Sequence, residues 1–186
     1  MEKNLREIVS FSSFEFDTLR EDENYLHVRI PRVNVIEMLL SARQRFGLDT
    51  LQLISAVDRL EDNVFQLTWI LEDSRGTSVF MISADYPREN CTVPTIGDIW
   101  KTAEVFEREL HEMYGIDFPG NPRQNEDFLL EDWRELPPMR RDFDTLEYSL
   151  RTYGERRKRM HTDPRKYIAE SIDEWDTPVP MKDSER

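Results

Sequence analysis

Residues 50–85 read T-L-Q-L-I-S-A-V-D-R-L-E-D-N-V-F-Q-L-T-W-I-L-E-D-S-R-G-T-S-V-F-M-I-S-A-D. They contain three runs rich in β-branched and aromatic residues, 50–58, 63–72 and 77–85, the composition typical of strands. Short connections that are rich in turn formers, R-L-E-D and then D-S-R-G, separate these runs. Connections this short join antiparallel neighbours, because parallel strands need a much longer crossover. The stretch therefore predicts three antiparallel strands of one sheet.

Two more strands and a helix are predicted on the N-terminal side of this stretch. The runs F-E-F-D-T (14–18) and L-H-V-R-I (26–30) alternate between apolar and polar residues, as strands with one buried face do. They read as a hairpin joined by the polar residues R-E-D-E-N (20–24). Residues 33–47 then carry apolar side chains at helical spacing, and Gly47 stands where a C-cap glycine belongs. This last segment predicts a helix of about three turns.

A second helix is predicted over residues 95–115. Thr95 and Asp98 form a pattern like a capping box, and Gly115 can end the helix. The apolar stripe of this helix would consist of Ile96, Ile99, Ala103, Phe106, Leu110 and Met113. A mostly antiparallel sheet of about five strands with two helices is an α+β domain, which we assign to residues 1–116.

The sequence pattern changes after residue 116. Helical periodicity is lost except for a modest candidate within 145–160, and prolines recur along the rest of the chain. Large rings are interleaved with them at Phe118, Phe128, Trp133, Phe143, Tyr148, Tyr153, Tyr167 and Trp175. Tails that only interact with solvent seldom carry so many aromatic residues, which are enriched at protein interfaces. Residues 117–186 therefore predict an extended, largely irregular arm that binds a partner protein.

Composition argues against several functional classes. The formal net charge of -13 disfavours binding to nucleic acid or to an anionic membrane. Cys91 is the only cysteine, so we expect neither an internal disulfide nor a bound iron–sulfur cluster. We also expect neither a membrane span nor a secretion signal. One alternative is an RNA-binding adaptor, because residues 151–166 are strongly basic and follow Tyr148, while Tyr153 lies among them.

The most densely charged part of the predicted second helix is E-R-E-L-H-E-M-Y-G (107–115). Its H-E-M-Y-G begins like the zinc motif His-Glu-x-x-His, but a glycine replaces the second histidine, so no metal site is predicted. At 100° per residue, Glu107 lies close to the apolar stripe and is expected to be partly enclosed. Its expected partner is an arginine or lysine of this chain or of a neighbouring subunit. A second alternative is a free-standing hydrolase that uses Glu107, Glu109 and His111.

Three runs in order, E-R-E-L-H-E-M-Y-G-I-D-F-P-G-N-P (107–122), L-L-E-D-W (129–133) and P-M-R-R-D-F (138–143), carry a resemblance to a known family. They resemble the signature of the 30 kDa subunit family of respiratory complex I (NADH-quinone oxidoreductase). Membrane-bound energy-converting hydrogenase-type complexes share this family. The family pattern is roughly E-R-E-x-x-D-x-[FY]-G-I-x-F-x-G-H-P, then a basic pair, E-D-W and P-L-R-K-D.

This sequence departs from the family pattern at three places. Glu112 replaces the aspartate, Asn121 replaces the histidine, and Asn125 and Glu126 stand where the basic pair is expected. Contacts made by that pair therefore cannot be carried over to this chain. The missing pair also favours a ferredoxin-linked, hydrogenase-like relative over an NADH-linked one.

The resemblance implies a non-catalytic scaffold subunit in the hydrophilic arm of a membrane-anchored redox complex that couples electron transfer to ion translocation. Such a subunit binds no cofactor, and the iron–sulfur clusters belong to its neighbours. It packs on a large subunit related to the nickel–iron hydrogenase large subunit, with a small iron–sulfur subunit nearby and membrane subunits in indirect contact. Its place is the cytoplasmic side of the cell membrane, with no nucleic acid bound.

The resemblance also implies which residues face partner subunits. The expected interface residues are Glu107, Arg108, Glu109, Tyr114, Gly115, Phe118, Gly120, Trp133, Arg140, Arg141 and Asp142. The acids and the arginine of E-R-E would fix the helix end, and the two glycines would permit a sharp exit from it. Trp133 and the R-R-D run would anchor the arm, because arginine can bind carboxylates across an interface through two parallel hydrogen bonds.

Overall fold

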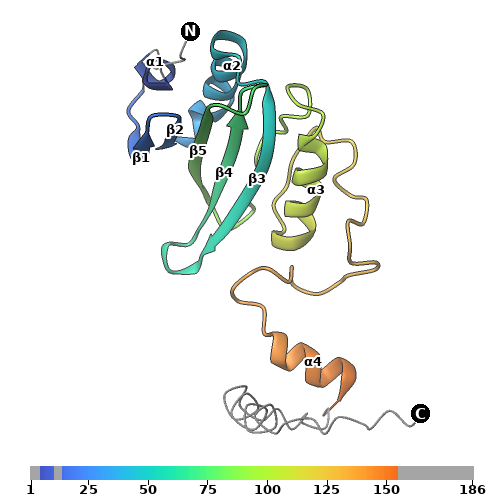
Figure 1. Cartoon of the computed structure of the whole chain (residues 1–186). Helices are drawn as coiled ribbons and strands as arrows, with labels where there is room; N and C mark the ends of the chain where they lie inside the picture. The colour runs from blue at the N-terminus through green and yellow to red at the C-terminus, as the bar shows by residue number, and fades with distance from the viewer. Residues whose placement is uncertain (1–4, 11–13, 155–186) are drawn as a thin grey trace, which may run out of the picture. The chain divides into compact units, whose positions relative to one another are not determined.

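The computed structural model describes residues 5–10 and 14–154 of the chain. Its contacts divide the chain into two units, Met1–Asp144 and Thr145–Arg186. The first unit contains a five-stranded sheet with the spatial order β1-β2-β5-β4-β3 (Figure 1). In the second unit, the described residues form the helix α4 (Thr145–Tyr153). It falls within the predicted candidate region 145–160, whose residues from 155 onward lie outside the described part.

The strands are β1 (Asp17–Asp22), β2 (Tyr25–Arg29), β3 (Thr50–Arg59), β4 (Val64–Glu72) and β5 (Val79–Pro87). As residues 50–85 predict, β3 pairs with β4 and β4 with β5 in antiparallel fashion. β2 and β5 are parallel neighbours, with Tyr25 opposite Val79 and Arg29 opposite Ser83. The connection between them, which contains a helix and two strands, is long enough for this crossover. The α+β fold with a mostly antiparallel sheet is confirmed, and one parallel pair makes the sheet mixed.

The first hairpin differs from its prediction in where its first strand begins and ends. β1 begins at Asp17 instead of residue 14, and all six of its residues are exposed, so it has no buried face. Arg20 and Asp22, expected in the loop, belong to the strand and form an ion pair of 3.0 Å. β1 is an edge strand, and charged side chains on an edge protect it from pairing with other chains. Phe14 precedes the strand and packs against the core.

The helices cover one face of the sheet. Phe65, Leu67, Trp69 and Leu71 of β4 alternate into the core. Val35, Met38, Leu39 and Ala42 of α2 (Val35–Phe46) and Ala103 and Leu110 of α3 (Ala103–Tyr114) belong to the same buried cluster. Both helices therefore pack on the face to which the β4 residues point. Gly47 ends α2 with a φ of 59°, as predicted.

Short helical segments complete the described part. The helix α1 (Leu5–Ser10), which no pattern in the sequence predicted, buries Leu5 and Ile8 in the core. Two 3-10 turns, η1 (Arg32–Asn34) and η2 (Leu60–Asp62), precede α2 and join β3 to β4.

The predicted start of the second helix at Thr95 is wrong, since α3 begins at Ala103. Residues 96–100 form a separate turn in which the N–H groups of Ile99 and Trp100 both bond the carbonyl of Ile96 at 2.9 Å. Trp100 is buried and donates its indole N–H to the carbonyl of Asp49 at 2.7 Å. The helix therefore begins three residues after this buried tryptophan, which a tertiary hydrogen bond holds in place.

Candidate functional site

Glu107 is the buried acid of α3, with 1% of its surface exposed. Its carboxylate accepts hydrogen bonds from the Thr95 hydroxyl at 2.6 Å, the Ile96 N–H at 2.8 Å and Asn121 Nδ2 at 2.9 Å. All three donors are neutral, so the prediction of an arginine or lysine partner within the described part of this chain is wrong. Burial raises the pKa of Glu107, although the three hydrogen bonds act in the opposite direction. Glu107 thus ties α3 to the turns on either side of it.

The exit from α3 depends on two glycines with positive φ. Gly115 ends the helix at φ 74°, and its N–H bonds the carbonyl of His111 at 2.8 Å. Gly120 has φ 97°, and a Cβ there would lie 2.9 Å from the Thr95 methyl group. Between them, Phe118 is buried in the core with 1% exposure. The chain therefore turns sharply and packs directly after α3.

Two side chains one turn apart on α3, Arg108 and Glu112, hold the loop of residues 126–130. Arg108 pairs with Glu126 at 3.0 Å. Glu112 accepts hydrogen bonds from three consecutive backbone N–H groups, those of residues 128, 129 and 130, at 2.6, 2.9 and 3.1 Å. Glu112 and Glu126 are both positions where this chain departs from the family pattern. The substituted residues bind within the chain.

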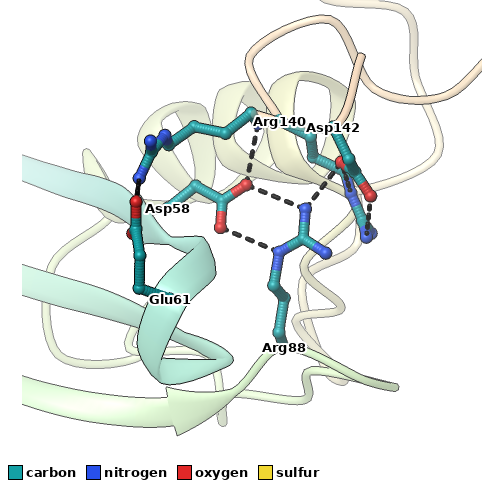
Figure 2. Close-up of polar contacts among 6 residues, drawn as sticks. Asp58, Glu61, Arg88, Arg140 and Asp142 are labelled. Atoms are coloured by element: carbon teal, nitrogen blue, oxygen red, sulfur yellow. Dashed lines mark hydrogen bonds and ion pairs between the residues drawn. The ribbon is translucent and has the colours of Figure 1, made fainter.

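A cluster of alternating charges links the end of β3 to the R-R-D run (Figure 2). Arg88, which follows β5, binds the carboxylate of Asp58 through two hydrogen bonds of 2.8 and 3.0 Å. Its Nη2 also donates to Asp142 at 2.6 Å. The backbone N–H of Arg141 donates to Asp58 at 2.8 Å, and the side chain of Arg141 binds Glu61. This cluster fastens residues 141 and 142 to the hairpin of β3 and β4.

The arginines of this cluster lower the pKa values of its two aspartates, Asp142 and Asp58. Hydrogen bonds from Arg88 and Arg140 hold the pKa of Asp142 well below its usual range. Hydrogen bonds from Arg88 and from the backbone of Arg141 lower the pKa of Asp58 despite its burial, which acts to raise it. Both carboxylates are therefore ionised at neutral pH.

Aromatic rings lie under the same cluster. The guanidinium groups of Arg88 and Arg140 each lie 5.8 Å from the centroid of the Phe65 ring. Tyr114 meets Phe65 edge to face at 5.9 Å, which connects the cluster to the last turn of α3. Arg140 also bonds Asp142 at 3.1 and 3.2 Å. These contacts of Tyr114, Arg140 and Asp142 are all within the chain.

The other predicted interface residues lie apart from this cluster. Trp133 donates its indole N–H to the carbonyl of Leu136 at 3.1 Å, and its ring lies 5.7 Å from that of Phe143. Glu109 is half-buried on α3, about 200° around the helix from Glu107. The predicted residues thus do not form one site: Glu107, Arg108 and Asp142 belong to three separate groups, and neither Trp133 nor Glu109 belongs to any of them.

The structure does not assemble the proposed hydrolase residues. His111 Nδ1 lies 2.9 Å from the carbonyl oxygen of Ile116, and the pocket beside His111 is lined by neither Glu107 nor Glu109. Among the described residues there is no group of three or more potential metal-ligating side chains. Cys91 is buried as a small core residue, and burial raises its pKa to about 12.

The structure describes only part of the basic segment, residues 151–166, on which the RNA-binding alternative rests. Arg151 lies on α4 with its guanidinium 5.9 Å from the Tyr148 ring, whereas residues 155–166 fall outside the described part of the chain. No helix among the residues that the structure describes is long and apolar enough to cross a membrane.

Three residues of the cluster were not predicted from the sequence: the buried pair Asp58 and Arg88, and the exposed Glu61. Asp58 ends the predicted strand 50–58, and Arg88 follows a proline shortly after the predicted strand 77–85. Charged residues are common at the ends of strands. Asp58 and Arg88 are 30 positions apart, and Arg88 and Asp142 are 54 apart. No pattern among neighbouring residues predicts contacts between residues so far apart in the sequence.

Comparisons with known proteins point to one family. The family model described as "Respiratory-chain NADH dehydrogenase, 30 Kd subunit" matches residues 28–149. An NADH-quinone oxidoreductase subunit of the C/D type from Phocaeicola vulgatus is 33% identical over 129 residues, which are 69% of this chain but 24% of that protein. Its counterpart of the C type from Citrifermentans bemidjiense is 25% identical over 147 residues, covering 77% of this chain and 91% of the relative.

Solved structures agree with the sequence matches. A chain of the membrane-bound sulfane sulfur reductase, an archaeal respiratory membrane complex, has a TM-score of 0.71 at 25% identity and covers 86% of this chain and 94% of its own length. The trypsin-resistant fragment of Nqo5 has a TM-score of 0.52 at 25% identity and covers 63% of this chain and 94% of the fragment. The protein therefore belongs to the family of the 30 kDa subunit of respiratory-chain NADH dehydrogenase.

Proposed function

We propose that this chain is a non-catalytic scaffold subunit of a complex I-like respiratory complex, in which it supports electron transfer coupled to ion translocation. One observation carries the proposal: charged residues of the family signature, among them Glu107, Arg108 and Asp142, form contacts within the chain that fasten its turns and loops to one another. Glu107 joins two turns to α3, and Asp142 joins the R-R-D run to Arg88. Such contacts fix the shape of a surface, which is what a scaffold requires.

The partners of the proposed scaffold follow from the family. We propose contact with a large subunit related to the nickel–iron hydrogenase large subunit and with a small subunit that carries iron–sulfur clusters. Membrane subunits would be reached indirectly, and we propose that this chain lies on the cytoplasmic side of the membrane. Any redox cofactor would then belong to those neighbours.

A further part of the proposal concerns the type of respiratory complex that contains this chain. The match to the sulfane sulfur reductase chain extends over 86% of this protein. Asn125 and Glu126 stand where the family pattern has a basic pair. The missing basic pair favours a complex of the ferredoxin-linked, hydrogenase-like branch over an NADH-linked one.

Purification of the native assembly tests the proposal. The full-length chain, tagged at its N-terminus and produced in its native host, is solubilised with mild detergent, and every copurifying polypeptide is identified. We expect cluster-binding and membrane-spanning subunits at fixed stoichiometry. Recovery of the chain alone as a stable protein with turnover of its own would contradict the proposal.

A further inference from the structure

The loop 126–130 is fastened to α3 at several points. Arg108 and Glu112 lie four residues apart and therefore share one face of the helix. The guanidinium of Arg108 binds Glu126 and lies 5.4 Å from the centroid of the Phe128 ring. Arg123 holds Glu126 from the other side at 2.8 Å. The beginning of the loop is thus fixed through both an acid and an aromatic ring.

Glu112 fixes the middle of the same loop. Its Oε2 accepts the N–H of Phe128, and its Oε1 accepts those of Leu129 and Leu130. Hydrogen bonds from backbone N–H groups to a carboxylate are short and strong because the acceptor is charged. Three of them in succession restrict the φ and ψ angles of the whole segment. The backbone of the loop is therefore ordered before any partner binds.

The side chain of Leu129 points outward from this ordered backbone. It is 72% exposed, although its own N–H is directed to Glu112. A single exposed leucine is common on protein surfaces and by itself indicates nothing. What distinguishes Leu129 is that its position is already set, so a partner that buries it does not have to order the loop. These are the properties of an anchor side chain at an interface.

The surroundings of Leu129 indicate which partner surface would fit. Residues 127–135 carry four carboxylates, Asp127, Glu131, Asp132 and Glu135, but a single guanidinium, that of Arg134. All five of these residues are exposed. The two arginines nearest to the start of the loop, Arg108 and Arg123, are already paired with Glu126. Leu129 is thus an exposed apolar residue whose neighbours in the sequence are mostly acidic, which favours a basic partner surface.

We propose that Leu129 inserts into an apolar pocket of a partner subunit and that lysine and arginine side chains surround this pocket. Complementary charge at the rim would steer association, whereas burial of the leucine would slow dissociation. Arg108 and Glu112 act as positioning residues, because they hold the loop and do not themselves enter the pocket. This inference rests on the proposed scaffold function, since it needs a partner subunit.

The test measures binding of full-length variants to the complex purified from a strain that lacks this chain. Truncation of an anchor residue typically weakens binding by a factor of about 30 or more, so Leu129→Ala should raise Kd by about that factor. Val33→Ala is the matched control, because Val33 is 81% exposed on η1 and none of the loop contacts involve it. Its Kd should stay within about twofold of the wild-type value. Unchanged thermal unfolding would show that both variants remain folded.

Two further variants separate the anchor from its support. Glu112→Ala should increase hydrogen exchange at the amides of residues 128–130, and Leu129→Ala should cost less affinity in that background than alone. Charge reversal by Glu131→Lys with Asp132→Lys should slow association and reduce its dependence on salt.

The outcomes distinguish this inference from the proposed function. Failure of the wild-type chain to bind the depleted complex would overturn the scaffold function itself. Tight binding of the wild type, together with equal affinities for Leu129→Ala and Val33→Ala, would overturn only the anchor. An association rate unchanged by the charge reversal would contradict the basic rim of the pocket.

Discussion

Arg88 holds Asp58 through two parallel hydrogen bonds, and both side chains are removed from solvent, at 8% and 1% exposure. The pair stands at the junction of two strands and the R-R-D run. Because the same guanidinium also binds Asp142, one side chain connects three parts of the chain that are distant in sequence. The stability of the arm up to Asp142 should depend on it.

Arg88→Met should destabilise the protein by about 3 to 5 kcal/mol, because it leaves the carboxylate of Asp58 buried without its cation. The free energy of unfolding from urea denaturation provides the measurement. Arg20→Met is the control: Arg20 is 68% exposed and pairs at 3.0 Å with Asp22, which is 56% exposed, so its loss should cost less than about 1 kcal/mol. Equal effects of the two substitutions would show that the buried cluster has no special role.

Acid should weaken the same cluster. The pKa of Asp142 is held below its ordinary value of 3.8, chiefly by Arg88. A depressed folded-state pKa contributes stability that is present above the unfolded value and is lost as the pH falls through the folded one. Asp142→Asn should therefore lower stability at pH 7 and flatten its decline between about pH 4 and pH 2. Parallel curves for variant and wild type, measured by denaturation across this range, would refute the assignment.

Asn121→His should make stability depend on pH near neutrality. The imidazole would donate to Glu107, so its pKa in the folded protein should rise above the ordinary value of about 6.5. A raised histidine pKa contributes stability that is fully present below the unfolded value and is lost as the pH rises through the folded one. We expect a gain of about 1 kcal/mol at pH 5 that disappears by about pH 9, measured as the free energy of unfolding. Asn125→His, at an exposed position, should show no such gain.

Arg140→Ala should weaken assembly of the complex while the isolated chain remains folded. Arg140 contacts Asp142 and the Phe65 ring, so its loss loosens the R-R-D run without exposing the core. The yield of partner subunits in a pull-down with the tagged chain measures this effect. Arg20→Ala serves as the comparison, because Arg20 is 68% exposed and pairs with Asp22 on the edge strand β1. Full recovery of partners with Arg140→Ala would contradict the expected role of this run.

Local patterns in the sequence predict much of the fold. The strands of 50–85 and the helix that ends at Gly47 follow from alternation, helical spacing and short turns, which depend on near neighbours. The parallel pairing of β2 with β5 could not be predicted in this way, because their partnership depends on how the intervening elements pack. The start of α3 could not be predicted from local patterns for a related reason. The Thr95 hydroxyl, expected to cap the helix, instead binds Glu107, a residue 12 positions away.

The site was predictable in part. Helical geometry correctly places Glu107 at the edge of the apolar stripe, and the structure buries it. The identity of its donors was not accessible, since two backbone turns bring Ile96 and Asn121 to it. Likewise, R-R-D could be recognised as a motif, but Asp58 and Arg88 become its partners only once the sheet has formed.

The scaffold function can be tested through the ratio of redox turnover to the amount of assembled complex. Membranes from a strain without this chain are supplied with the wild type or with Arg140→Ala, Leu129→Ala, Glu109→Gln or His111→Ala. Redox activity and the amount of assembled complex are then measured together. A scaffold predicts that activity per assembled complex stays constant for every variant, and that only the amount of complex falls. A variant that assembles fully but loses turnover would show that this chain contributes a catalytic group.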